Sequence, residues 1–249
     1  MSLADVKAYY NKVFRPDMTT IVVIGRITPE EARREIVQYF GSWQASGPKP
    51  NLDLPAVPPN KPSEQVVPDP SRVQDRVMLA QVGGLTRTSA DYYPLQVGMN
   101  VLSGGFYATR FFRDLREETG LVYTVGGRLD AGPNRSVLTI GYGCDPENVS
   151  KARAIIVRDL QAMQQQDVTA DELLQAKTLL LRRIPLSQAS VGGIAYQYLT
   201  LVREKLPLDE PQKAAHRIIG ISSKEVRQAF GKWIRPHDLV QVTQGPAPK

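Results

Sequence analysis

The sequence contains few of the residues that zinc enzymes and disulfide-bonded domains require. It has one cysteine, Cys144, and two histidines, His216 and His237, among 249 residues. A single cysteine cannot form a disulfide within the chain or a zinc site of several thiolates. The two histidines are far apart in the sequence, whereas a helical zinc site places two histidines one turn apart, with a glutamate beside them. A mononuclear zinc site of the usual kind is therefore excluded, and we expect no cofactor in this chain alone.

Long hydrophobic runs and blocks of like charge are also missing. No segment approaches the roughly 18 apolar residues of a membrane-spanning helix, and the start MSLADVKAYY lacks the features of a signal peptide. The formal charge is +6, but the lysines and arginines are scattered among acidic residues. Such mixing is typical of solvated helix faces. We therefore expect neither a membrane span nor a nucleic-acid partner.

Motifs of other enzyme classes are not found. There is no G-x-S-x-G nucleophile elbow and no phosphate-binding G-x-x-x-x-G-K-[ST] loop. The glycine-rich stretches GGLTRT (83–88) and SGGFYATR (103–110) lack the strand–turn–helix context of a dinucleotide site. Gly104 and Gly105 are typical of the end of a helix. No catalytic group is identified by these patterns.

Apolar periodicity predicts an α+β fold. Strands are expected from alternating or short apolar runs at 19–25, 74–85, 121–132, 134–145 and 239–245. Helices are expected from apolar residues at helical spacing at 3–14, 28–41, 91–105, 108–120, 147–165, 170–183, 191–205, 209–218 and 222–234. The order of these elements predicts a largely antiparallel sheet covered by helices on one face.

The two ends of the chain repeat one another at an offset of 220 residues. The segment 2–25 aligns without a gap on 222–245. Identical pairs include Ser2/Ser222, Val6/Val226, Lys12/Lys232, Arg15/Arg235, Pro16/Pro236, Val22/Val242 and Gly25/Gly245. Short helix–turn–strand units converge easily, but an ungapped register that keeps both the Arg-Pro turn and the final glycine favours a duplicated domain.

The repeat and one proline-rich segment suggest the domain organisation. Residues 45–74 hold eight of the nineteen prolines and little periodicity, which predicts a stiff, extended linker. Residues 1–44 are then the helix–strand–helix tail of a preceding homologous domain, and 75–249 are a complete domain. A strand separated from its sheet leaves unpaired backbone groups and an exposed apolar face. We therefore expect 1–44 to dock on the 75–249 sheet or to be shared with another copy.

The stretch LREETGLVY (115–123) has two readings. Arg116 could complement the carboxyl end of a helix, and Tyr123 could be a core residue of the following strand. Alternatively, the two residues have a functional role. The residues alone leave both possibilities open.

The surrounding segment resembles a known family. Residues 102–125, LSGGFYATRFFRDLREETGLVYTV, are similar to the pattern L-x-G-G-x-x-S-R-L-F-x-x-L-R-E-x-x-G-L-A-Y-x-V of pitrilysin/insulinase zinc metallopeptidases. The likeness extends to residues 14–43, to the proline-rich connector and to the helix order of 147–233. One departure is small, since T-R-F-F (109–112) replaces S-R-L-F. The missing H-x-x-E-H zinc motif is a large departure.

The resemblance implies a fold and a function. The family's LuxS- and processing-peptidase-like α+β domains close in pairs around a peptide, and the first domain carries the zinc. The second domain is metal-free and contributes an arginine and a tyrosine to the substrate and the oxyanion; these match Arg116 and Tyr123. On this reading Gly120 reverses the chain after the helix, so that Arg116 and Tyr123 face one point as hydrogen-bond donors. The resemblance thus implies a zinc-bearing partner domain or subunit and a peptide substrate, with no hydrolysis by this chain alone. Bacterial relatives are often exported, although no targeting segment is visible here.

A second hypothesis belongs to a different class of protein. The fold also occurs in core subunits that have lost protease activity, so the chain could be a purely structural homologue. Retention of both Arg116 and Tyr123 favours the first hypothesis. A neighbouring H-x-x-E-H motif, in the same or an adjacent coding sequence, would distinguish the two.

Overall fold

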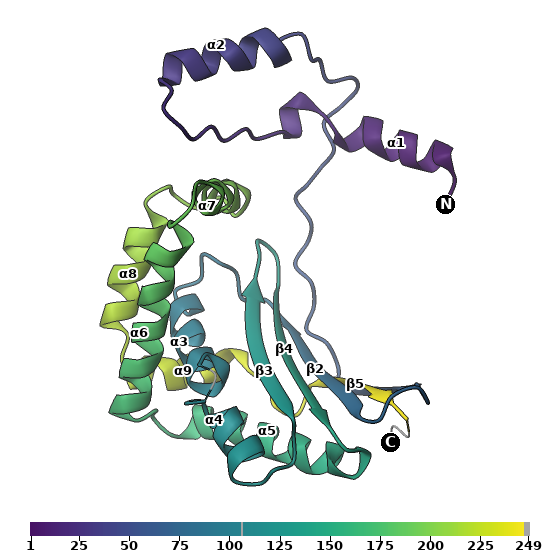
Figure 1. Cartoon of the computed structure of the whole chain (residues 1–249), viewed down its shortest axis with the longest axis vertical. Coiled ribbons are helices and arrows are strands. Elements are labelled where there is room, and N and C mark those ends of the chain that lie inside the picture. Colours follow the sequence, from purple (N-terminus) through teal and green to yellow (C-terminus); the bar gives the residue numbers. More distant parts are fainter. Residues whose placement is uncertain (106, 247–249) are drawn as a thin grey trace. The chain divides into compact units, whose positions relative to one another are not determined.

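The computed structural model describes residues 1–105 and 107–246 (Figure 1). The chain divides into two compact units. The smaller consists of Met1–Pro55 and Leu186–Leu208, and the larger of Ala56–Pro185 and Asp209–Lys249. None of the described helices is long and apolar enough to cross a membrane.

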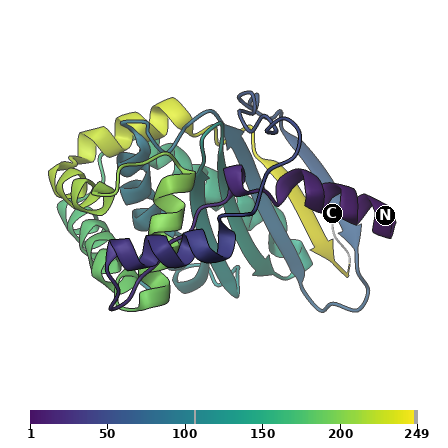
Figure 2. The ribbon, with the colours of Figure 1, turned by 90° about the horizontal axis from the view of Figure 1, so that it is seen from above.

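A five-stranded sheet forms the centre of the larger unit. Its order is β1-β5-β2-β4-β3, with the yellow β5 lying between β1 and β2 (Figure 2). All neighbouring strands are antiparallel except β1 and β5, which are parallel. The strands are β1 (Ser63–Pro68), β2 (Asp75–Gly83), β3 (Thr124–Ala131), β4 (Ser136–Cys144) and β5 (Val240–Gly245). The expected largely antiparallel α+β sheet is confirmed.

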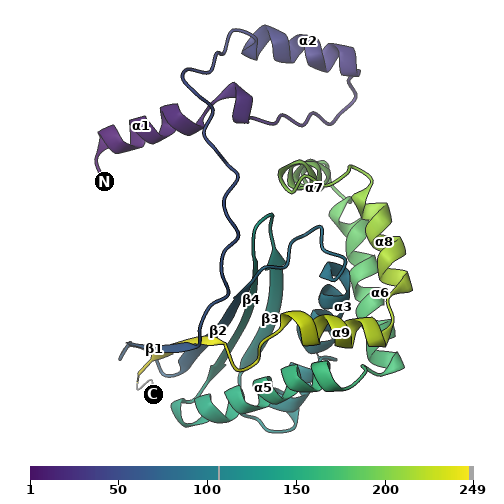
Figure 3. The ribbon, with the colours of Figure 1, turned by 180° about the vertical axis from the view of Figure 1, so that it is seen from behind.

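Helices cover one face of this sheet (Figure 3). The burial of β2 and β4 alternates along each strand, because successive side chains point to opposite faces. The inward side chains pack against α3 (Tyr92–Ser103), α5 (Val149–Gln165) and α9 (Ser223–Trp233) in one core. Fully buried members of this core include Leu79, Leu95, Leu102, Leu138, Ile140, Ile156, Leu160 and Phe230. The other face, which carries Arg76 and Met78, is called the open face below.

Further helices lie wholly or mostly in the larger unit. They are α4 (Arg110–Phe112), α6 (Ala170–Ser187) and α8 (Glu210–Gly220). The helix expected at 108–120 is instead α4 followed by a π-helical segment, Arg113–Glu117. In this segment Glu118 N–H donates to the Arg113 carbonyl at 2.8 Å, a wider turn than an α-helix makes. Arg116 lies in this π-helical segment, so the wider turn sets the position and direction of its side chain.

The smaller unit contains α1 (Leu3–Val13), α2 (Pro29–Phe40) and α7 (Val191–Arg203). Ser2 with Asp5, and Thr28 with Glu31, form capping boxes at the starts of α1 and α2. Neither of these two helices has a buried side chain. The apolar residues that define their periodicity are therefore exposed or only part-buried in this chain.

Two sequence expectations in the first 74 residues are corrected. Residues 19–25, expected to be a strand, form none, because a strand needs hydrogen-bonded neighbours and no described strand pairs with this segment. Residues 45–74, expected to be linker throughout, contain β1, which pairs with β5. Proline is tolerated in an edge strand because its missing N–H can face outward, where no neighbouring strand would form a hydrogen bond with it. β1 follows Pro62 and ends at Pro68 in this way.

Candidate functional site

The candidate site begins where the π-helical segment ends. Gly120 has φ = +63°, a left-handed conformation that glycine adopts at little cost. The Leu115 carbonyl then accepts the N–H groups of Leu121, at 3.0 Å, and Val122, at 3.3 Å. These bonds close the helix end and send the chain directly into β3. The predicted reversal at Gly120 is therefore present.

Arg116 and Tyr123 lie side by side across this reversal. The Arg116 guanidinium carbon is 5.7 Å from the centre of the Tyr123 ring, within the range of a cation–π contact. Arg116 Nη1 also donates to the Val122 carbonyl at 3.1 Å. Both side chains are exposed, and Tyr123 keeps 47% of its surface accessible. Tyr123 is thus not a core residue, and both side chains reach the surface.

A third residue, Asp145, joins this pair. The Tyr123 hydroxyl donates to the Asp145 carboxylate, with an O–O distance of 3.1 Å to Oδ2. This hydrogen bond raises the pKa of Tyr123, so the phenol stays protonated. Asp145 was not predicted from the sequence. The predicted hairpin contained a signal, since folding 121–132 onto 134–145 brings the start of one strand to the end of the other.

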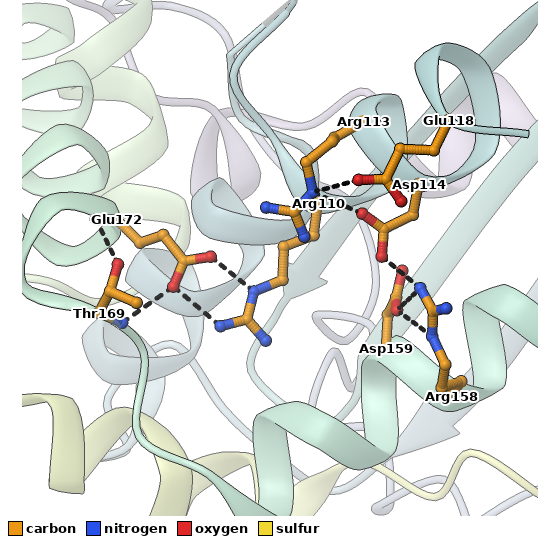
Figure 4. A network of polar contacts seen from close by, with 8 residues as sticks. All are labelled: Arg110, Arg113, Asp114, Glu118, Arg158, Asp159, Thr169 and Glu172. Atoms are coloured by element: carbon orange, nitrogen blue, oxygen red, sulfur yellow. Dashed lines mark hydrogen bonds and ion pairs between the residues drawn. The ribbon is translucent and has the colours of Figure 1, made fainter.

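An ion-pair network holds the helical segment that carries Arg116 (Figure 4). Arg110 of α4 binds Glu172 of α6 through two parallel bonds of 2.7 and 2.8 Å. Glu172 also accepts the Thr169 N–H at 2.9 Å, and these bonds lower its pKa to about 2. Bidentate, part-buried pairs of this kind are geometrically specific. The network therefore fixes the position of α4 against α6.

The second half of the network attaches the same segment to α5. Arg113 binds Asp114 at 2.7 Å, and Arg158 of α5 binds both Asp114 and Asp159. Asp159 is only 3% exposed, and its Oδ2 has no hydrogen-bond partner among the described residues. Burial raises the pKa of Asp159 to about 6, because it disfavours the charged form.

This buried carboxyl predicts a pH-dependent stability. The folded chain holds the Asp159 proton more strongly than the unfolded chain between pH 3.8 and about 6. The free energy of unfolding should therefore fall by about 2 to 3 kcal/mol as pH rises through this window. The last part of that fall, about 1 kcal/mol, lies between about pH 5 and 7, above the range in which Glu172 titrates. Asp159→Asn should remove it, as measured by urea unfolding across that range. The exposed Asp171→Asn is the control, and an unchanged slope in Asp159→Asn would contradict the assignment.

Two hollows flank the start of β3, one on each side of the strand. The first, of about 230 Å³, lies beside Tyr123 and is lined by Ser103, Gly104, Gly105, Thr109, Phe112 and Val125. The second, of about 490 Å³, lies over the open face between Arg72, Arg76, Met78, Gly126, Gly141 and Gly143. Thr124, Val125 and Gly126 line both hollows. They are called the inner hollow and the open-face hollow below.

The described residues offer no metal centre. No three histidine, cysteine, aspartate or glutamate side chains are grouped so that they could hold an ion within 1–105 and 107–246. His237 Nε2 lies 2.8 Å from Gln161 Nε2 on the helical side, away from Arg116 and Tyr123. Cys144 is buried, and burial raises its pKa to about 12, which makes it unreactive.

Known proteins similar to this chain include two from one bacterium. A relative from Bacillus subtilis, the "Uncharacterized zinc protease YmxG", is 25% identical over 188 residues, covering 76% of this chain and 44% of its own length. The "Probable inactive metalloprotease YmfF" of the same organism is 25% identical over 180 residues, covering 70% and 40%. The chain thus spans less than half of either relative.

A solved structure extends the likeness to the whole fold. The peptidase M16 inactive domain from Pseudomonas fluorescens superposes with a TM-score of 0.87 and 25% identity, covering all of this chain and 59% of that one. The family model described as "Peptidase M16 inactive domain" matches residues 1–180, well over half of the chain. The chain belongs to the family of peptidase M16 inactive domains.

Proposed function

We propose that this chain is the metal-free, substrate-binding half of a zinc peptidase clamp, in which Arg116 and Tyr123 hold the peptide and stabilise the oxyanion. The observation that carries the proposal is the exposed pairing of Arg116 with Tyr123 at the start of β3, beside the inner hollow. A homologous zinc-bearing domain or subunit would supply the metal and cleave the peptide bond.

The chemistry of the two side chains suits this role. Attack of water on a peptide carbonyl places negative charge on the carbonyl oxygen, and positioned donors in a site shielded from water stabilise that charge. Arg116 offers several N–H groups, of which Nη1 is bound to the Val122 carbonyl. The single hydroxyl proton of Tyr123 is donated to Asp145, so Tyr123 would have to turn from Asp145 to donate to a substrate. Arg116 is therefore the stronger candidate for the oxyanion.

The repeat supports a preceding homologous domain as the partner. Ser222 and Glu225 form the same capping box before α9 that Ser2 and Asp5 form before α1. Phe230 of α9 is fully buried, whereas its counterpart Tyr10 in α1 is 54% exposed. Strand β5 pairs with β1 and β2, whereas the equivalent residues 20–25 pair with no described strand. Residues 1–44 therefore lack the neighbours that the second copy has, and we propose that a preceding domain provides them.

The structural-homologue hypothesis has one observation in its favour. Both polar groups are bound within the chain, Arg116 to the Val122 carbonyl and Tyr123 to Asp145. If they only stabilise the start of β3, they have no part in proteolysis. The two hypotheses differ in what a mutation does to turnover rather than to folding.

The test is reconstitution of the clamp. The chain is mixed with the zinc-bearing domain or subunit encoded beside it, and hydrolysis of a fluorogenic peptide is followed with and without the chain. We expect cleavage only in the mixture and its loss on chelation of zinc. Full activity of the zinc-bearing partner alone would refute a substrate-binding role for this chain.

A further inference from the structure

The helical segment that carries Arg116 has a charged group among its buried residues. Phe111 and Leu115 are fully buried, and Asp114, which lies between them in the sequence, is only 7% exposed. An apolar residue at this position would avoid the cost of removing a carboxylate from water. Buried ion pairs add little net stability compared with apolar packing, and their best-documented use is to select one geometry. Asp114 is therefore a candidate for fixing the geometry of this segment.

Asp114 binds one arginine of its own segment and one arginine of α5. Arg113 Nε donates to Asp114 Oδ1 at 2.7 Å. Arg158 Nη2, on α5, donates to Asp114 Oδ2 and also to Asp159 Oδ1, the latter at 2.7 Å (Figure 4). Arg158 Nε donates to the same oxygen of Asp159 at 2.9 Å, so two bonds orient the guanidinium. The Asp114–Arg158 ion pair therefore joins the π-helical segment to a fixed group on α5.

The wide turn starts beside this ion pair. Its hydrogen bond from Glu118 N–H to the Arg113 carbonyl spans five residues instead of the four of an α-helix. Thr119 Oγ1 lies 2.8 Å from the Asp114 carbonyl oxygen and 3.1 Å from that of Leu115, so its proton is shared between them. Asp114 thus contacts α5 through its side chain and the end of the turn through its carbonyl. Single wide turns of this kind occur frequently at functional sites.

The geometry of the turn sets the direction of Arg116. An α-helix advances about 100° around its axis with each residue, and a π-turn contains one residue more than an α-turn. If the segment relaxed to an α-helix, Arg116 and the residues after it would shift by up to one position around the axis. The 5.7 Å contact with Tyr123 and the 3.1 Å bond to the Val122 carbonyl both depend on the present direction. Relaxation would therefore separate Arg116 from Tyr123.

We propose that Asp114 and Arg158 are positioning residues, whose ion pair keeps 113–117 in the π-helical form and thereby directs Arg116 toward the substrate. Asp114 is buried and Arg158 belongs to α5, so both act through Arg116 rather than on the peptide. This inference rests on the proposed role of Arg116 in peptide cleavage. It extends that role to two residues that lie outside the Arg116–Tyr123 pair.

Turnover in the reconstituted clamp tests the proposal. Asp114→Asn keeps the shape of the side chain but removes its charge, and Arg158→Gln removes the partner on α5. Each should lower kcat about tenfold with a smaller change in KM, because a displacement of about 1 Å can cost up to about 100-fold. Arg153→Gln is the matched control, since Arg153 is also on α5 but is paired with Glu64 of β1. An unchanged kcat in either Asp114→Asn or Arg158→Gln would overturn the proposal.

A double-mutant cycle separates positioning from general destabilisation. If Asp114 acts through Arg116, Asp114→Asn should lower kcat in the parent but not in the Arg116→Ala background. Equal losses in both backgrounds would show that Asp114 acts elsewhere, and they would refute the positioning role alone. A normal kcat in Arg116→Ala is a different result, since it would refute the proposed function and this inference with it.

Hydrogen exchange of the chain by itself tests the wide turn without any activity. The Glu118 N–H should exchange about tenfold faster in Asp114→Asn and Arg158→Gln than in the parent, as measured by NMR, and Arg153→Gln should not change it. Arg158→Gln also deprives Asp159 of its cation, so urea unfolding at the same pH is used to separate local loosening from a loss of overall stability. Unchanged exchange of Glu118 in both variants would show that the ion pair does not maintain the turn, and the proposal would fail.

Discussion

Replacing Arg116 with alanine is expected to lower the kcat of the reconstituted peptidase by about 100-fold, the cost of removing one oxyanion donor. The guanidinium is exposed and lies next to Tyr123, and no carboxylate within 1–105 and 107–246 is bound to it. A donor that acts on the developing charge contributes more in the transition state than in the ground state, so kcat should fall more than KM changes. The measurement is steady-state hydrolysis of a fluorogenic peptide by the zinc-bearing partner mixed with each variant.

Controls distinguish this role from a structural one. Arg227→Ala removes an arginine that is paired with Asp167 at 3.3 Å on α9, and it should leave turnover unchanged. Tyr123→Phe removes only a hydroxyl, and we expect a smaller loss, about tenfold, because that hydroxyl is shared with Asp145. Normal turnover in both Arg116→Ala and Tyr123→Phe would support the purely structural homologue. Variants that unfold at the same urea concentration as the parent rule out a folding defect.

Replacing Phe230 with alanine should lower the free energy of unfolding by about 4 kcal/mol, as is typical for a buried aromatic residue. Phe230 of α9 is fully buried against α3. Its ring leaves no room for a side chain at Gly98, because an added Cβ would overlap its Cε2 atom. Because the packing is so close, the neighbouring residues can move little to fill the cavity that the alanine substitution would leave. Urea unfolding of the isolated chain measures the loss.

The repeat provides a matched control for that substitution. Tyr10 occupies the equivalent position in α1 but is 54% exposed, so Tyr10→Ala should change the free energy of unfolding by less than about 0.5 kcal/mol. When the preceding homologous domain is joined to the chain, Tyr10 should become buried, and the cost should approach that of Phe230→Ala. An unchanged, negligible cost in the longer protein would contradict the proposal that residues 1–44 complete that domain.

Elements with strong local patterns could be predicted from the sequence. Helix α9 and strand β5 were expected at 222–234 and 239–245, and they occupy Ser223–Trp233 and Val240–Gly245. The same pattern at 2–25 produced its helix but not its strand. A capping box and apolar spacing act within one helix, whereas a strand depends on neighbours that can lie anywhere in the chain. β1 was missed for the converse reason, since its pairing with β5 outweighs its proline-rich surroundings.

The candidate site was predictable only in part. Arg116, Gly120 and Tyr123 are close in sequence, so their proximity follows from one turn, and the structure has that turn. Their role in peptide binding stays a prediction. Asp145, and the ion pairs that join α4 to Glu172 and Asp159, connect residues far apart in the chain. No local sequence pattern predicts such contacts, because they form only when the sheet and the helices pack together.

The two edges of the sheet also bear on self-aggregation, the usual hazard of an open β-sheet. A second copy of the molecule could not continue the hydrogen-bond ladder past Val125, because Ser103 and Gln96 already occupy the next groups of β3. At the opposite edge, β1 is only six residues long, follows Pro62 and ends at Pro68, and neither proline donates an N–H. Both edges therefore resist the edge-to-edge growth that leads to fibres.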